Sequence, residues 1–321
     1  MIVPPPASNP TITIIVATYA RPEALARALE SLSQQTRPLD ELIVAAWAED
    51  EPTLETVHRL QVGPIWSASP IGLRLVVTAD NTVVAKENAG LAIASGGIVG
   101  FMDDDAVARP DWLERITGWY ADPSVGAVGG RDVIRRGDPV PEYPVRDVGR
   151  VRWWGRLVGN HHRPAVGARD VDFLKGVNMS FRRSLLPRID DRLAGPVPYG
   201  FEIDLGLHVR GLGQRVIFDP AIVVDHYPST DYSASSPIAW TVNRNQTYVL
   251  LKRLSLTRKI AFLLYTTLIG DRNSVGVARV PLLILRERWS WSAVGAHFSG
   301  KIAGLRAYLG SPRDASERVE A

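Results

Sequence analysis

The chain has 321 residues, 45% hydrophobic and 22% charged, with a formal net charge of +3 at pH 7. This is an ordinary globular composition, long enough for one large domain or for a domain with an appendage. There is no cysteine, which excludes a disulfide framework and a thiolate metal site, so any metal ion must be held by oxygen and imidazole ligands.

The positive charge is concentrated at the C-terminal end. Residues 241–321 contain 13 Lys and Arg against 5 Asp and Glu, and residues 1–240 contain 24 against 29, so the tail is +8 and the body −5. A basic region of this kind attracts phosphate, whether in nucleic acid or in an anionic lipid surface, and charge alone does not choose between them.

Neither end of the sequence carries a recognisable targeting or spanning segment. Residues 1–10 lack the positive start and the unbroken apolar stretch of a secretory signal. The apolar stretches 260–269 and 275–285 are shorter than the ~20 residues that cross a bilayer. We therefore expect a cytoplasmic protein without a transmembrane helix.

Strands and helices alternate over the first hundred residues. Residues 11–17 (TITIIVA) are apolar and β-branched, as in a strand buried on both faces, and Pro22 then opens a segment with leucines at helical spacing. The same unit recurs, with strands expected at 41–46, 73–78 and 98–102 and helices at 52–60 and 83–94. This alternation predicts a parallel sheet flanked by helices, with ligands bound beyond the carboxyl ends of the strands.

Three adjacent carboxylates follow the strand at 98–102. Asp103, Asp104 and Asp105 repel one another unless a cation or a cluster of donors is present, so Mg²⁺ or Mn²⁺ together with substrate phosphates is the natural partner. An acidic surface turn is the alternative interpretation of this triplet.

Several blocks, in order, resemble the family 2 glycosyltransferases, whose fold is known as GT-A. The resemblance covers roughly residues 10–230 and implies an α/β fold: a single Rossmann-like mixed sheet flanked by helices, with a C-terminal helical extension. The blocks are IIVATYAR at 14–21, NAGL at 88–91 with Gly96-Gly97, the acidic triplet, KGVNMSFRR at 175–183, and residues 200–220. Two positions depart from the family pattern: Ala46 stands where an aspartate that reads the base is usual, and Glu87 stands where arginine is common.

The resemblance implies an inverting, metal-dependent transfer of a hexose or deoxyhexose from a nucleotide-diphosphate sugar to a hydroxyl of a glycan or a lipid-linked acceptor. Glu202, in the first turn of a helix, is the expected catalytic base, with Asp204 as its neighbour. Asp103, Asp105 and His226 are the expected metal ligands. The donor is expected to bind to Thr18, Tyr19, Arg21, Asp50, Asn88, Asp103, Asp104, Lys175 and Asn178.

The sequence pattern divides the whole chain into four segments. We expect a disordered segment at 1–10, a GT-A catalytic domain at 11–236, a basic amphipathic helical extension at 237–310 and a flexible tail at 311–321. The extension either completes the core or lies on an anionic membrane, as a peripheral protein would. Residues 135–170 are expected to form a lid or an acceptor-facing loop, which holds His161, His162, Trp153 and Trp154.

Three other functions remain open at this point. A sugar nucleotidyltransferase would need a glycine-rich basic loop after the first strand, which residues 18–21 lack. A pI of 9.2 would suit a nucleic-acid-binding protein. The tail has no recognisable nucleic-acid-binding motif, however, and the body is acidic, so we expect no nucleic-acid partner. A catalytically inactive relative that binds nucleotide sugars would suit the departures at Ala46 and Glu87.

Overall fold

The computed structural model describes residues 10–67, 71–136, 143–193, 195, 199–228 and 236–311. The expected disordered segment and flexible tail lie outside these residues, except for Pro10 and Ser311. The chain divides into two compact units, described separately below: the first holds 1–151, 157–194 and 201–231, and the second holds 152–156, 195–200 and 232–321. The segment boundaries expected from the sequence remain predictions.

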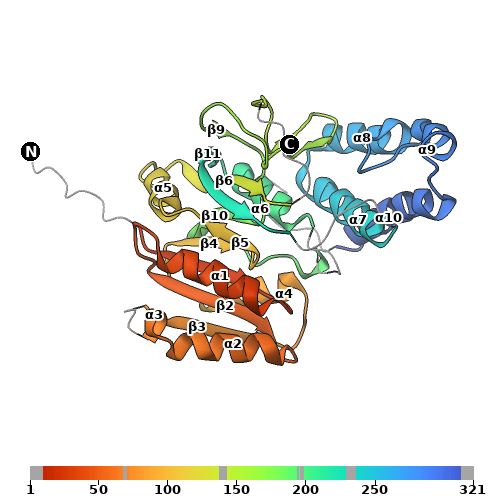
Figure 1. Ribbon diagram of the computed structural model, residues 1–321. Coiled ribbons are helices and arrows are strands. Elements are labelled where there is room, and N and C mark those ends of the chain that lie inside the picture. The colour runs from red at the N-terminus through yellow and green to blue at the C-terminus, as the bar shows by residue number, and fades with distance from the viewer. Residues whose placement is uncertain are drawn as a thin grey trace, which may run out of the picture. The chain divides into compact units, whose positions relative to one another are not determined.

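Within the described residues, nine strands of the first unit form one mixed sheet (Figure 1). Their order is β3-β2-β1-β4-β10-β6-β11-β5, with β9 paired to β11. Strands β1 to β4 run parallel, whereas β10 is antiparallel to both of its neighbours, β4 and β6. The bounds are β1 Ile12–Ala17, β2 Glu41–Trp47, β3 Leu73–Thr78, β4 Ile98–Met102, β5 Ala106–Ala108, β6 Val125–Ile134, β9 Arg169–Asp170, β10 Asn178–Arg182 and β11 Arg215–His226. The α/β mixed sheet expected from the resemblance is confirmed.

Helices flank this sheet, and α1 shows how an apolar face packs against it. Helix α1 begins at a proline and buries Leu25, Leu29 and Leu32, and the Asp50 side chain caps α2 by accepting a hydrogen bond from the backbone N–H of Thr53. The bounds are α1 Pro22–Ser33, α2 Glu51–Val62, α3 Pro64–Ser67, α4 Val83–Ile93, α5 Trp112–Trp119 and α6 Phe201–Gly211, with short 3₁₀ turns η1 Arg183–Leu185 and η2 Asp191–Leu193. The loops at the carboxyl ends of β1 and β4 are therefore held on a packed scaffold.

A close approach between β6 and β11 fixes the position of His226. The register of this parallel pair is irregular between Asp219 and Val223, and a Cβ on Gly130 of β6 would lie 1.9 Å from the carbonyl oxygen of Ile222. Beyond the irregularity, β11 pairs with β5 so that His226 lies opposite Ala106. The strand therefore delivers His226 next to the end of the acidic triplet.

Most of the described part of the segment expected as a lid belongs to the first unit, and residues 152–156 belong to the second. Strands β7 Arg150–Val151 and β8 Leu157–Val158 form a small antiparallel pair, and β9 joins the main sheet. His161 is buried; its Nε2 lies 3.1 Å from the carbonyl oxygen of Phe173, and its ring packs on Phe173 and Phe218. The ring of His161 is therefore enclosed by the fold, and the expectation that the segment faces an acceptor stays a prediction.

The second unit is helical, which confirms the expected C-terminal helices. It contains α7 Ser236–Arg253, α8 Leu256–Leu264, the π-helical turn η3 Tyr265–Ile269, the 3₁₀ turn η4 Val277–Arg279, α9 Val280–Leu285 and α10 Trp291–Leu309. Helices α7 and α10 lie side by side (Figure 1), where a Cβ on Gly304 would lie 2.3 Å from the carbonyl oxygen of Arg244. Among the described residues, no helix has the length and hydropathy needed to cross a membrane.

Candidate active site

Two carboxylates and one imidazole converge where β4 and β11 end. Ligand atoms of Asp103, Asp105 and His226 all lie within 4.8 Å of one another, and His226 Nε2 is 3.2 Å from Asp105 Oδ1. Asp105 Oδ1 is buried, and although His226 Nε2 lies at ion-pair distance it forms no hydrogen bond of good geometry with this oxygen. A buried carboxylate oxygen of this kind needs a cation or a donor, so the group fits a divalent ion with oxygen and nitrogen ligands.

The middle carboxylate of the triplet points to the loop after β1 instead. Asp104 accepts hydrogen bonds from Thr18 Oγ1 at 2.8 Å, the backbone N–H of Tyr19 at 3.4 Å and Arg21 Nη1 at 3.0 Å. The same nitrogen of Arg21 lies 2.5 Å from Asp105 Oδ2. Arg21 therefore offsets part of the repulsion within the triplet. The structure brings Thr18, Tyr19, Arg21 and Asp104 together, and their role in donor binding stays a prediction.

The charges of the site shift the pKa values of its members. Burial and the neighbouring Asp105 raise the pKa of Asp103 to about 6. Burial would lower the pKa of His226, but its contacts with Asp105 and Asp132 and the charge of Asp103 raise it to about 9. Without a metal ion, His226 therefore carries a proton near neutral pH and stabilises the carboxylates around it.

Asp132 of β6 lies behind His226 and was missed by the sequence analysis. It is fully buried; its Oδ2 is 3.5 Å from His226 Nδ1 and accepts a hydrogen bond from Lys175. Burial would raise its pKa, yet His226 and Lys175 lower it to about 2. Asp132 has little local signal, because the glycine-rich strand that carries it lacks a clear pattern of β-branched residues.

The loop after β1 is held in an unusual conformation. Ala20 has a φ of 52°, in the left-handed region that a non-glycine residue rarely adopts, and its N–H donates to Asp50 Oδ2 at 2.6 Å. Lys86 of α4, also missed by the sequence analysis, is buried and donates to the carbonyl oxygen of Thr18 at 3.0 Å. Asp50 and Lys86 therefore fix this loop, and the ring of Tyr19 stays 47% exposed beside Trp47.

Three other residues that were expected to bind the nucleotide-sugar donor form hydrogen bonds or an ion pair within the protein. Asn178 is fully buried: it accepts from Trp112 Nε1 at 2.9 Å and donates to the carbonyl oxygen of Ile222 at 3.1 Å. Asn88 exchanges hydrogen bonds with the backbone of Ile189, and Lys175 pairs with Asp132. The donor-binding role of these three residues stays a prediction that these contacts do not support.

The expected base lies in the first turn of α6, where the helix dipole favours a carboxylate. Glu202 is partly buried, and Asp204 is buried. Burial, together with the charges of Asp103 and Glu202, raises the pKa of the buried Glu87 well above its usual value. Glu202 and Asp103 therefore both raise the pKa of Glu87 and belong to the same acidic region.

Comparisons with known proteins agree with this geometry. A family model described as glycosyl transferase family 2 matches residues 13–189, more than half of the chain. A glucosyl-dolichyl phosphate glucuronosyltransferase of Haloferax volcanii is 26% identical over 239 residues, which cover 67% of this chain and 68% of that protein. Glycosyltransferase AglE of the same organism is 22% identical over 264 residues, which cover 80% of each chain.

Two solved structures share the fold. Mannosyltransferase PcManGT from Pyrobaculum calidifontis, in complex with GDP-Man and Mn²⁺, aligns with a TM-score of 0.55 and 20% identity, covering 96% of this chain and 89% of that one. GalNAc-T7 with UDP, GalNAc and Mn²⁺ aligns with a TM-score of 0.60 and 13% identity, covering 81% of this chain and 56% of that one. The chain belongs to glycosyl transferase family 2 and has the GT-A fold of a glycosyltransferase.

Proposed function

We propose that the protein transfers a hexose or deoxyhexose from a nucleotide-diphosphate sugar to a hydroxyl of a glycan or a lipid-linked acceptor, with inversion at the anomeric carbon. One observation carries the metal-dependent part of this proposal. It is the convergence of ligand atoms from Asp103, Asp105 and His226 within 4.8 Å, with a buried Asp105 oxygen that faces His226 without a hydrogen bond of good geometry. The Mn²⁺ named in both solved relatives supports the same choice of ion, and Mg²⁺ has the same ligand preference.

The residues around this point suit a diphosphate donor. Mg²⁺ or Mn²⁺ held by Asp103, Asp105 and His226 would neutralise charge on the departing diphosphate. Arg21 pairs with Asp104 and Asp105, and its side chain is 37% exposed. The exposed ring of Tyr19 offers a flat apolar face for a nucleotide base.

Glu202 is proposed as the group that accepts the proton from the acceptor hydroxyl. Its place in the first turn of α6 favours the ionised carboxylate, which is the form that a general base requires. Attack of the deprotonated oxygen on the face opposite the leaving diphosphate then inverts the anomeric carbon, and no covalent sugar intermediate is needed.

Two observations favour an acceptor linked to a lipid. The glucuronosyltransferase of Haloferax volcanii is named for a glucosyl-dolichyl phosphate, which is lipid-linked. The second unit of this chain also carries exposed apolar and basic side chains, described in the next subsection.

The Glu202→Gln variant tests the proposed role of this residue. Glutamine keeps the size and hydrogen bonding of the side chain but cannot accept the proton, so we expect unchanged donor affinity and loss of transfer. A panel of nucleotide sugars with Mn²⁺ would measure nucleotide release, and NMR of the product would report the anomeric configuration. Near-normal turnover would contradict the assignment and make Asp204 the next candidate for the base.

The same panel separates the alternatives. A nucleotidyltransferase would form a nucleotide sugar from a sugar phosphate and release pyrophosphate, whereas a glycosyltransferase releases the nucleoside diphosphate. An inactive relative would be protected against heat by a donor and would release nothing.

A further inference from the structure

Exposed apolar side chains form one continuous stripe in the second unit. Leu256, Ile260, Leu264 and Leu268 follow one another at four-residue spacing along α8 and η3, and each is at least 53% exposed. Side chains at this spacing lie on the same face of a helix. Ile269, Leu285 of α9 and Trp291 at the start of α10 add further exposed apolar surface in the same unit.

Basic residues accompany the stripe. Between Leu256 and Trp291 the sequence has six Lys or Arg and two acidic residues, a balance of +4. Arg286 and Arg288 are exposed just after α9. A helical surface that combines an apolar stripe with positive charge suits the interface of an anionic bilayer, where apolar side chains are buried and basic ones meet lipid phosphates.

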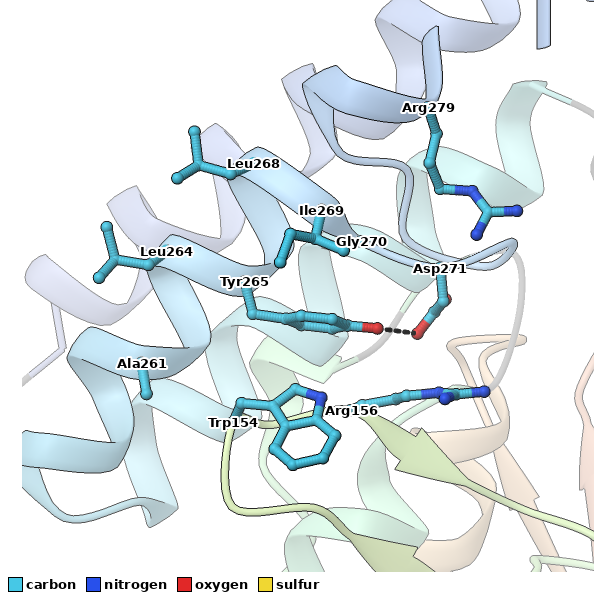
Figure 2. A pocket seen from close by; sticks show the side chains of 10 residues that line it. All are labelled: Trp154, Arg156, Ala261, Leu264, Tyr265, Leu268, Ile269, Gly270, Asp271 and Arg279. Carbon is cyan, nitrogen blue, oxygen red and sulfur yellow. Dashed lines mark hydrogen bonds between the residues drawn. The ribbon is translucent and has the colours of Figure 1, made fainter. Parts of the chain in front are cut away.

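A pocket of about 590 Å³ opens beside the stripe, and its ends differ in polarity (Figure 2). Leu264 and Leu268 lie at one end, and the guanidinium groups of Arg156 and Arg279 lie toward the other, near Asp271. The apolar end of the pocket is therefore part of the stripe itself.

The polar end of the pocket has an excess of positive charge. Asp271 is already engaged, because its carboxylate accepts from the backbone N–H groups of Asn273 and Ser274 and from the Tyr265 hydroxyl. Arg279 Nε is buried and has no hydrogen-bond partner. Two guanidinium groups against one carboxylate leave a net charge of +1, and a buried N–H without an acceptor calls for an anionic oxygen.

We propose that this face of the second unit binds the surface of a bilayer that contains anionic phospholipid, with a lipid phosphate entering the pocket to reach Arg156 and Arg279. The phosphate meets the polar end, and the apolar part of the lipid meets Leu264 and Leu268. The stripe lies in the interface between head groups and acyl chains. This binding does not depend on sugar transfer, so it can be tested without a donor or an acceptor.

Vesicle flotation of the full chain tests the proposal. We expect flotation with vesicles of phosphatidylcholine and phosphatidylglycerol in equal amounts, little flotation with phosphatidylcholine alone, and weaker binding as salt is raised. A double variant, Arg156→Gln with Arg279→Gln, should weaken binding to the anionic vesicles by roughly thirtyfold. A second double variant, Leu264→Gln with Leu268→Gln, should weaken it by roughly tenfold or more.

Val62→Gln is the matched control, because Val62 is an exposed apolar side chain of the first unit and should leave flotation unchanged. An equal loss of flotation in this variant, or no flotation at low salt, would overturn the proposal. The proposal would also be overturned if the protein did not float and inorganic phosphate protected it against heat only when Arg156 and Arg279 were present. The pocket would then bind a free anion. A dimer in sedimentation that becomes a monomer in the leucine variant, without vesicle binding, would show instead that a second copy covers the stripe.

Discussion

Replacing Asp132 by asparagine tests whether the residue behind His226 sets the metal affinity of the site. Asparagine keeps the volume of this fully buried side chain and removes its charge. Asp132 Oδ2 is 3.5 Å from His226 Nδ1, so the carboxylate can orient the ring whose Nε2 faces Asp105. Loss of such a partner of a metal-bound histidine typically weakens binding by about 10- to 100-fold, or roughly 1.4–2.7 kcal/mol.

A second effect opposes this loss and depends on pH. Contacts with Asp105 and Asp132 help to raise the pKa of His226 to about 9, and a metal ion must displace that proton. Below the raised pKa, affinity in the wild type falls about tenfold per pH unit. The variant lacks one cause of the shift, so its His226 loses the proton at lower pH. The ratio of wild-type to variant affinity should therefore be largest near pH ~8.5 and should shrink toward pH ~7.

Calorimetric titration with Mg²⁺ at the two pH values measures this ratio. Asp225→Asn is the matched control, because Asp225 is next to His226 on β11 but points to the opposite face and pairs with Arg135 at 2.5 Å. We expect the control to bind Mg²⁺ as the wild type does. An Asp132→Asn affinity equal to or tighter than that of the wild type near pH ~8.5, or a ratio that does not change with pH, would refute the reasoning.

Two further predictions concern the acidic triplet and the second unit. The Asp105→Ala variant should keep its far-UV circular dichroism and lose Mn²⁺-dependent donor binding, and unchanged donor affinity in calorimetry would contradict the proposed site. Burial lowers the pKa of Lys301 from 10.5 to about 8, and Lys301 donates to the carbonyl oxygens of Thr266 and Val275. The folded protein therefore loses this proton at lower pH than the unfolded chain. Relative to Lys301→Met, the free energy of unfolding of the wild type should rise by up to about 1.4 kcal/mol per pH unit between pH ~8 and ~10.5 and stay level below that range. Urea titrations of both proteins would measure this difference. A difference that does not change with pH would contradict the prediction.

The sequence by itself determined the elements whose pattern is local. The β-branched run at 12–17 gives β1 because it suits a strand buried on both faces, and the proline and leucines that follow give α1. The acidic triplet was recognisable because three carboxylates at a strand end are costly without a cation. His226 was recognisable from its place at the end of an apolar strand together with the family resemblance.

Only the tertiary structure decided which polar side chains meet. Asp132 and Lys86 belong to other elements than the triplet, and the pairing of β6 with β11 and the packing of α4 bring them to the site. Asn178 lay within a matching block, yet the register of β10 between β4 and β6 turns its amide into the core. The physical reason is that a strand's register fixes the face on which each side chain lies, and register depends on partners that no local pattern reveals.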